Sequence, residues 1–262
     1  GSLNSRIFQM KIEPGDLAFM PQSDETRLRT LGDEIFERLR ADIISSRLAP
    51  GKKLRFHDLR DTYGVGVSPL REALSRLAEN RLVVATSQRG FHVSEVSVEN
   101  ITDVSMVRRH VDGLALRLSI QSGDDSWEGE LLSARHKLAL LERAGSDVAE
   151  DLWERRHREF HYTLIAACRS PCLLHLHGIL NDQFDRYRRL SAKTAQKSGP
   201  RALMHKQILE ASLARNADKA VKLLENHISE ATKWIVAGLR EQPGSGQGSI
   251  RSGKKSKTKA RA

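Results

Sequence analysis

The sequence has little cysteine and no long apolar run. Among its 262 residues only Cys168 and Cys172 are cysteines, which is too few for a disulfide scaffold, so we expect two reduced thiols. No stretch approaches the ~20 consecutive apolar residues that span a bilayer, and no secretory signal pattern is visible. These absences favour a cytoplasmic protein that has no membrane partner.

The residues that are present indicate a folded, basic protein of two domains. Hydrophobic residues make up 39% of the chain, and a chain of this length can form two cores of ordinary size. The formal net charge of +10 suggests a polyanionic partner. About half of that charge lies in residues 241–262, which we expect to form a disordered basic tail. Residues 1–26 lack sustained periodicity, so we expect a flexible N-terminal extension.

Residues 27–95 have the pattern of a small domain that begins with helices. Apolar residues at helical spacing predict a first helix over Leu28–Ser46. A proline-glycine turn then leads to a short second helix that begins near His57. The glycine-rich segment 63–66 ends this helix, because glycine favours turns over helix interiors.

A third helix follows directly, and its signals are strong. Ser68 is expected to cap it and Pro69 suits its first position. Glu72 is placed to pair with Arg76 one turn later, and Asn80 tolerates a left-handed C-terminal cap. The apolar face of this helix is predicted to comprise Leu70, Ala73, Leu74 and Leu77.

Two β-prone runs complete the domain. They are Leu82–Thr86 and Phe91–Val93, and they flank a turn at residues 87–90. Helix, tight turn, helix and hairpin in this order predict a winged helix-turn-helix, a DNA-binding architecture.

These residues resemble the N-terminal domain of the GntR family of bacterial transcription regulators. The resemblance rests on PG-x-x-L from Pro50, YGV from Tyr63, SPLREAL from Ser68 and RGF-x-V from Arg89. The family usually reads V-S-R-x-P before this helix, whereas Val67 replaces the arginine here, so operator preference cannot be transferred from relatives. A valine can instead contact a thymine methyl group.

The resemblance implies which residues bind DNA. The third helix would lie in the major groove, where Arg71 in its first turn can reach the two acceptors of a guanine. Arg55 and Ser68 would contact DNA beside it, and Arg89 and Gly90 would form the wing tip near the minor groove. An exposed arginine without a ligand is the alternative interpretation of Arg71.

Residues 96–240 predict an all-α antiparallel bundle of six or seven helices, so the fold class is mainly α. No strand-like stretch occurs after the wing, and Ser170-Pro171 and Arg215-Asn216 separate helices. The expected helices are Val98–Gln121, Trp127–Ala144, Val148–Ala167, Leu173–Leu190, Ala202–Ala214 and Ala217–Leu239.

A set of histidines in this bundle is a candidate metal site. His157 and His161 are four residues apart and lie on one helix face, where two imidazoles can bind one ion. His205 and His227 lie near apolar residues on later helices, and bundles bind metals through inward-facing side chains. Spacing alone leaves open that these are structural histidines hydrogen-bonded to water or to a bound carboxylate.

The same region resembles the FCD-type effector domain of the FadR-like branch of the GntR family. Many of its members bind a divalent metal through one Asp or Asn and three histidines, which His161, His205 and His227 match. His157 stands at the Asp or Asn position, and an all-imidazole set suits Zn or Ni. The resemblance also places Arg108 at the cavity, where it can bind the carboxylate of a small effector.

We therefore predict a ligand-responsive bacterial transcription regulator that acts as a repressor and is cytoplasmic and nucleoid-associated. It would be a homodimer on a palindromic double-stranded operator. A metal-dependent hydrolase is one alternative, but the base of a zincin motif would have to replace Arg158. The other is a non-specific architectural DNA-binding protein, whose basic tail contacts phosphates without reading sequence.

Overall fold

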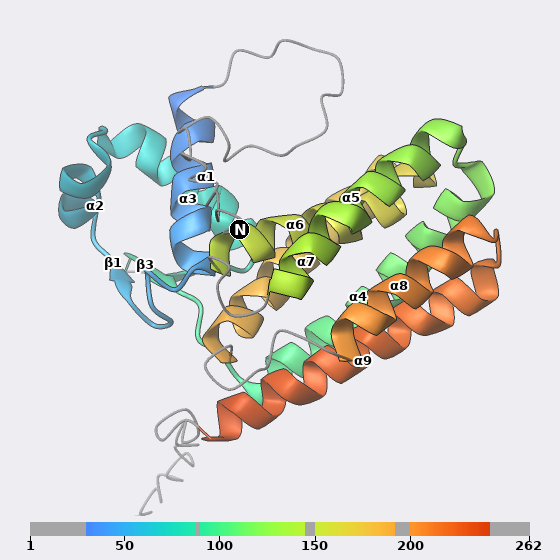
Figure 1. The fold of residues 1–262 in the computed structure, drawn as a ribbon. Helices are drawn as coiled ribbons and strands as arrows, with labels where there is room; N and C mark the ends of the chain where they lie inside the picture. The colour runs from blue at the N-terminus through green and yellow to red at the C-terminus, as the bar shows by residue number, and fades with distance from the viewer. Residues whose placement is uncertain (1–29, 87–89, 145–149, 192–199, 242–262) are drawn as a thin grey trace, which may run out of the picture.

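The protein consists of a small N-terminal domain and a larger helical domain (Figure 1). The computed structural model describes residues 30–86, 90–144, 150–191 and 200–241. The expected N-terminal extension, the wing tip at 87–89 and residues 242–262 of the expected tail lie outside these ranges. Within them, no helix is both long and apolar enough to cross a membrane.

The N-terminal domain combines three helices with a three-stranded antiparallel sheet of order β1-β3-β2. The short strand β1 was not predicted from the sequence, because two residues carry no periodicity. The elements are α1 (Leu31–Ile44), β1 (Lys53–Leu54), α2 (Phe56–Tyr63), α3 (Val67–Glu79), β2 (Val83–Thr86) and β3 (Gly90–Val93).

Local signals explain where these helices begin. Thr30 and Asp33 form a capping box at the start of α1, in which each side chain accepts a hydrogen bond from the backbone N–H of the other. The prediction that Ser68 caps α3 is wrong. Helix α3 begins two residues earlier than expected, its N-cap is Gly66, and no side chain caps it, so Ser68 lies inside the first turn.

Two other details of α3 also differ from the sequence-based expectations. Arg76 pairs with Asp33 of α1 at 2.7 Å rather than with Glu72 on its own helix, so this ion pair joins two helices. Asn80 ends α3 with an ordinary negative φ. The left-handed residue is instead Arg81, with φ 59°.

The core of the N-terminal domain is apolar throughout. The predicted face of α3 is buried against α1, and β2 and β3 close the core with Val83 and Val93, which are paired in the sheet. This arrangement confirms a winged helix-turn-helix. Its core residues include Ile35, Leu39, Ile43, Leu54, Leu59, Leu70, Leu74, Leu77 and Leu82.

The helical domain contains six α-helices among the described residues, as predicted. Arg169 and Arg215 adopt left-handed conformations at two of the expected breaks, and Asn216 accepts from the backbone of Lys219 at the start of α9. The helices are α4 (Val98–Ser122), α5 (Asp125–Ala144), α6 (Glu150–Ile165), α7 (Pro171–Ser191), α8 (Pro200–Leu213) and α9 (Ala217–Glu241), with a 3-10 turn, η3 (Ala166–Cys168).

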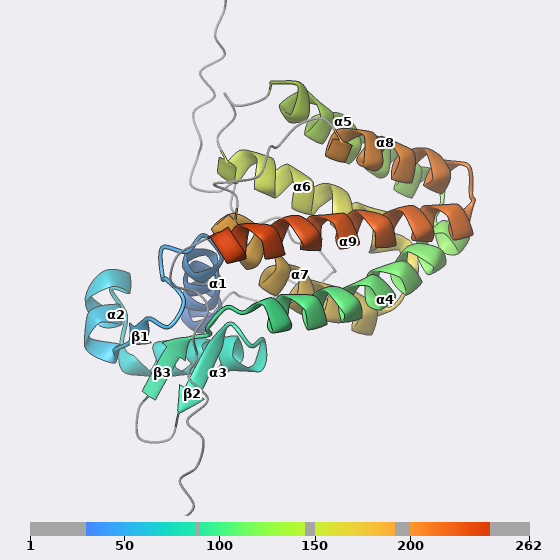
Figure 2. The ribbon, with the colours of Figure 1, turned by 90° about the horizontal axis from the view of Figure 1, so that it is seen from below.

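Long-range packing brings α6, α8 and α9 around one interior. Helix α4 packs against α7 and α9, while α5 packs against α6 and α8, as the view from below also shows (Figure 2). Apolar side chains such as Leu116, Leu131, Phe160 and Ile208 fill the core. Both cysteines are free, with Cys168 buried and Cys172 exposed.

The two domains meet along α1 and α7. Arg40 of α1 binds the carboxylate of Asp182 on α7, and Gln183 donates to the backbone carbonyl of Asn80 at 3.3 Å. Arg186 donates to the carbonyl of Ser94. Three residues within about one and a half turns of α7, Asp182, Gln183 and Arg186, therefore each bind a different part of the N-terminal domain.

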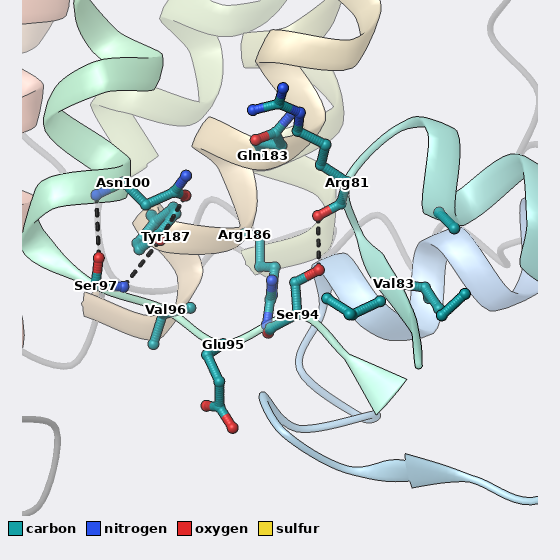
Figure 3. A pocket seen from close by; sticks show the side chains of 13 residues that line it. Arg81, Val83, Ser94, Glu95, Val96, Ser97, Asn100, Gln183, Arg186 and Tyr187 are labelled. Atoms are coloured by element: carbon teal, nitrogen blue, oxygen red, sulfur yellow. Dashed lines mark hydrogen bonds between the residues drawn. The ribbon is translucent and has the colours of Figure 1, made fainter. Parts of the chain in front are cut away.

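A cleft of about 510 Å³ lies at this junction (Figure 3). Its walls come from both domains, including Val83 and Ser94 on one side and Tyr187 on the other. The hydroxyl of Tyr187 accepts from the backbone N–H of Ser97 at 3.0 Å, which fixes the linker to α7. Burial lowers the pKa of Arg186 to about 10, because a cation loses hydration there.

Candidate metal centre and DNA-binding surface

The predicted DNA contacts lie on an exposed face of the N-terminal domain. Arg55 at the start of α2 and both Ser68 and Arg71 in the first turn of α3 are exposed. Gly90 begins β3 with φ 79°, a left-handed conformation that glycine adopts without strain. Arg89 lies outside the described residues.

Arg71 is held in place by aromatic packing. Its guanidinium lies 5.2 Å from the centre of the Phe56 ring, a cation–π distance. Phe56 in turn meets Phe91 edge to face, with ring centres 6.1 Å apart. This chain of contacts links α3, α2 and the wing. Among the described residues no carboxylate forms an ion pair with Arg71. Val67 is 38% exposed beside it.

All four predicted histidine ligands converge in the helical domain. His157 and His161 extend from α6, His205 from α8 and His227 from α9. One ring nitrogen from each lies within 4.8 Å of the corresponding atoms of the other three. The Nε2 atoms of His157 and His161 are 3.2 Å apart, because one helical turn stacks these side chains.

The chemistry of this cluster fits a transition metal. All four histidines are buried, and burial together with nearby positive side chains lowers the pKa of His157, His161 and His227 well below the ordinary value. The pKa of His205 falls to about 3. Neutral imidazoles offer lone pairs, and the buried Nε2 of His205 has no hydrogen-bond partner, as expected of a metal ligand.

Side chains outside the cluster orient two of the rings. Trp153 stacks on His157 with ring centres 4.6 Å apart. The guanidinium of Arg188 lies over the Trp153 ring, 5.2 Å from its centre. Glu142 on α5 lies 2.7 Å from Nδ1 of His205. Arg135, two turns earlier on α5, lies 3.0 Å from the same carboxylate.

The cluster opens onto a chamber of about 170 Å³. His157, His161 and His227 line it, together with Trp153, Phe184 and Trp234 and three arginines, Arg108, Arg188 and Arg201. The interdomain cleft is larger, yet it contains no metal-ligating side chain apart from one glutamate. Chemistry rather than volume therefore makes the chamber beside the histidines the candidate ligand site.

The three chamber arginines differ in how they are paired. Arg108 is 3% exposed and its Nε donates to Asp112 at 3.0 Å, while Asp112 also contacts Nδ1 of His177 at 2.8 Å. Arg188 pairs with Glu154 and Asp185. Among the described residues no carboxylate pairs with Arg201, whose guanidinium lies 5.4 Å from the Trp234 ring centre.

A network of ion pairs runs from the chamber wall to the N-terminal domain. Arg188 binds Asp185 at 2.7 Å, Arg158 contacts both Asp185 and Asp182, at 2.5 and 2.6 Å, and Asp182 is bound by Arg40 of α1. Burial alone would raise the pKa of Asp185, but Arg158 and Arg188 outweigh it and hold the pKa below its usual range. The network therefore stays charged.

Sequence reasoning identified the histidines and Arg108 but missed the residues that support them. Glu142, Arg188, Arg201 and His177 come from three helices, α5, α7 and α8, that only the tertiary fold brings together. The single local signal was the spacing of Arg135 and Glu142, which puts both on one face of α5. His177, which sequence reasoning did not assign to the site, is buried against Asp112.

A winged helix-turn-helix that is ion-paired to a helical bundle with a histidine-lined chamber has the organisation of a DNA-binding transcription regulator. Family comparison agrees with this class: residues 31–93 match the model of bacterial regulatory proteins of the gntR family, and residues 103–230 match the FCD domain. The chain belongs to the GntR family and carries an FCD domain.

Individual relatives have the same organisation. The chain is 38% identical over 241 residues to BphR of Paraburkholderia xenovorans (strain LB400), an uncharacterized HTH-type transcriptional regulator, covering 89% of this chain and 97% of BphR. It is 34% identical over 195 residues to the HTH-type transcriptional repressor GlaR of Escherichia coli (strain K12), covering 72% and 89%. These relatives are DNA-binding regulators and not enzymes, which rules out the hydrolase alternative.

A solved structure supports the fold at lower identity. McbR/YncC of E. coli superposes with a TM-score of 0.69 at 17% identity, covering 79% of this chain and 98% of that protein. At this identity the likeness concerns the arrangement of helices and strands. The predicted fold class is confirmed.

Proposed function

We propose that this regulator is a metal-containing repressor whose affinity for DNA changes when it binds a small organic acid. The observation that carries the proposal is the convergence of four buried imidazoles from three helices on the wall of a chamber lined by arginines. The names of GlaR and RspR, both transcriptional repressors of E. coli, support repression rather than activation.

The proposed metal is a divalent transition ion, with Zn or Ni favoured by the all-imidazole set. His157, His161, His205 and His227 would hold it, leaving positions for an acidic ligand from the chamber. Metal analysis after purification without chelators or an affinity metal column tests this. We expect about one ion per chain in the wild type and loss of the ion in a His161→Ala/His205→Ala variant. Wild-type protein that neither contains nor takes up Zn or Ni contradicts it.

The proposed effector is a small carboxylate. The chamber is compact, and Arg201 has no carboxylate partner among the described residues, while Arg108 retains guanidinium nitrogens beyond its contact with Asp112. Both arginines can bind a carboxylate. A thermal-shift screen of carboxylic acids, with and without Zn, is expected to give hits that weaken in Arg108→Gln and Arg201→Gln. An acid that binds both variants as well as the wild type would place the effector elsewhere.

DNA recognition is proposed for the exposed face of Arg55, Ser68, Arg71, Arg89 and Gly90. Arg71→Ala is expected to lower affinity for an operator selected from random duplexes about 5- to 150-fold, because a bidentate guanine contact is worth roughly 1–3 kcal/mol. Fluorescence anisotropy measures this. Arg117→Ala is the matched control, since Arg117 is paired with Asp218 in the helical domain and its removal changes the net charge equally.

We further propose a homodimer that binds a palindromic operator. Helix α4 exposes Met106, Val107 and Leu114, and exposed apolar side chains on one helix are typical of an interface. Light scattering coupled to size exclusion is expected to give twice the chain mass for the wild type and a monomer for Leu114→Glu. A wild-type monomer at micromolar concentration would contradict the proposal.

A further inference from the structure

Glu142 of α5 contacts a metal-ligating histidine without being part of the histidine cluster. Its Oε1 lies 2.7 Å from Nδ1 of His205, and both side chains are buried, with His205 fully inaccessible. Among the described residues, it is the only carboxylate hydrogen-bonded to one of the four clustered imidazoles. It therefore differs from Glu154 and Glu159, which pair with arginine or lysine side chains.

This contact fixes which nitrogen of His205 carries the proton. A carboxylate only accepts hydrogen bonds when ionised, so Nδ1 must donate to it and Nε2 must carry the lone pair. Nε2 is the buried atom without a hydrogen-bond partner, and the ring lies 4.6 Å from that of His227 and 5.2 Å from that of His157. The free lone pair is therefore on the side where the imidazoles meet.

Arg135 holds Glu142 from the other side. Its Nη1 lies 3.0 Å from Oε2 of Glu142, and its Nη2 donates to the backbone carbonyl of Ala202 at 3.1 Å. Ala202 is in the first turn of α8, three residues before His205. Arg135 and Glu142 therefore connect α5 both to the ring of His205 and to the backbone of the helix that carries it.

We infer that Glu142, supported by Arg135, is a positioning residue for the metal centre. The inference rests on the proposed metal function. Four neutral imidazoles bring no negative charge to a divalent ion, and Glu142 supplies one through the ring of His205. A carboxylate on the far nitrogen makes a histidine a more basic ligand and holds its orientation, and loss of such a partner typically weakens metal binding 10- to 100-fold.

Zinc affinity, measured by competition with a chromophoric chelator on the full-length protein, tests the inference. Glu142→Ala is expected to bind Zn about 10- to 100-fold more weakly than the wild type, with Glu142→Gln between the two because its amide oxygen can still accept from Nδ1. Glu159→Ala is the matched control. Glu159 is a buried carboxylate of the same domain that touches none of the four rings, so its removal should leave zinc affinity within about twofold of the wild type.

A second readout separates positioning from general loss of structure. In metal-free protein, ¹⁵N–¹H NMR correlations of the histidine rings should report His205 protonated at Nδ1 in the wild type and a mixture of tautomers in Glu142→Ala. Equal zinc affinity of wild type and Glu142→Ala overturns the inference, and so does an unchanged tautomer of His205 in Glu142→Ala. Absence of zinc binding in the wild type refutes the proposed metal function instead, so the two failures are distinguishable.

Discussion

The two domains use opposite means to hold their interiors together. Among the described residues of the N-terminal domain no charged side chain is buried, and its core is aliphatic and aromatic. The helical domain buries ten arginine, aspartate and glutamate side chains beside its four clustered histidines; they are Arg108, Asp112, Arg135, Glu142, Glu154, Glu159, Asp182, Asp185, Arg186 and Arg188.

This difference fits the binding role proposed for each domain. A DNA-reading surface needs its cations outside, where they meet phosphates and base edges, so an apolar core is sufficient. A chamber for a charged ligand needs cations inside, and buried cations are tolerated only when carboxylates and hydrogen bonds compensate them. The stability of the helical domain should therefore depend on charge pairing, while that of the N-terminal domain should depend on apolar packing.

Removal of one buried carboxylate gives the largest expected effect. Asp185 accepts from Arg158, Arg188 and Asn181. Asp185→Ala therefore removes one of the two carboxylate partners of both Arg158 and Arg188 and should lower the free energy of unfolding by about 3–5 kcal/mol. All three tryptophans belong to the helical domain, so tryptophan fluorescence in a denaturant titration reports its unfolding selectively.

The matched change in the N-terminal domain is Asp33→Ala. Asp33 pairs with Arg76 and closes the capping box of α1 at a partly exposed site, so its loss should cost about 1 kcal/mol. Far-UV circular dichroism, combined with the loss of DNA binding, measures the unfolding of this domain. If Asp33→Ala and Asp185→Ala lower the free energy of unfolding equally, the two domains do not differ in how much their stability depends on charge pairing.

The contrast also explains what the sequence could predict. Apolar periodicity gave the helices of both domains, because burial of one face repeats along the chain. The four histidines were predictable because two lie one turn apart and the family resemblance supplied the others. Arg201 and Glu142 were not predictable as partners of the site, since their roles depend on how α5 and α8 pack. The wrong cap prediction at Ser68 shows a smaller limit: an error of two residues in the start of α3 changes which residue stands at the N-cap.

The ion pair between Arg40 and Asp182 joins the N-terminal domain to the charged network of the helical domain. Arg40→Ala removes the N-terminal end of the network that reaches Arg188 in the chamber wall. Calorimetry of wild-type protein with and without Zn should show the unfolding of both domains shifting together. In Arg40→Ala the N-terminal domain should lose this response, which corresponds to a coupling of about 1–3 kcal/mol.

Arg47→Ala is the control for this experiment. Arg47 follows α1 in sequence and pairs with Asp42 within the N-terminal domain, so it removes an arginine without touching α7. The two variants should differ in how Zn shifts the unfolding of the N-terminal domain. The fold of each domain should be the same in both variants. An Arg40→Ala protein whose domains still shift together would mean that Gln183 and Arg186 carry the coupling.

Acid sensitivity gives the finest distinction between the domains. Burial lowers the pKa of His161 well below its ordinary value, so in metal-free protein the folded state keeps this imidazole neutral while the unfolded chain takes up a proton below pH ~6.5. The unfolded state then binds more protons, and stability is lost as pH falls through that value. Each such histidine contributes up to about 1.4 kcal/mol per pH unit.

Denaturant titrations at pH 7.5, 6.5 and 5.5 in the presence of a chelator, ~1 pH unit apart so that the linkage slope can be read directly, measure this contribution. His161→Gln should have a shallower loss of stability with acid than the wild type, by up to about 1.4 kcal/mol per pH unit. His136→Gln should match the wild-type slope, because His136 is exposed on α5. If both variants keep the wild-type slope, the acid sensitivity does not arise from the cluster, and its imidazoles are not held neutral by burial.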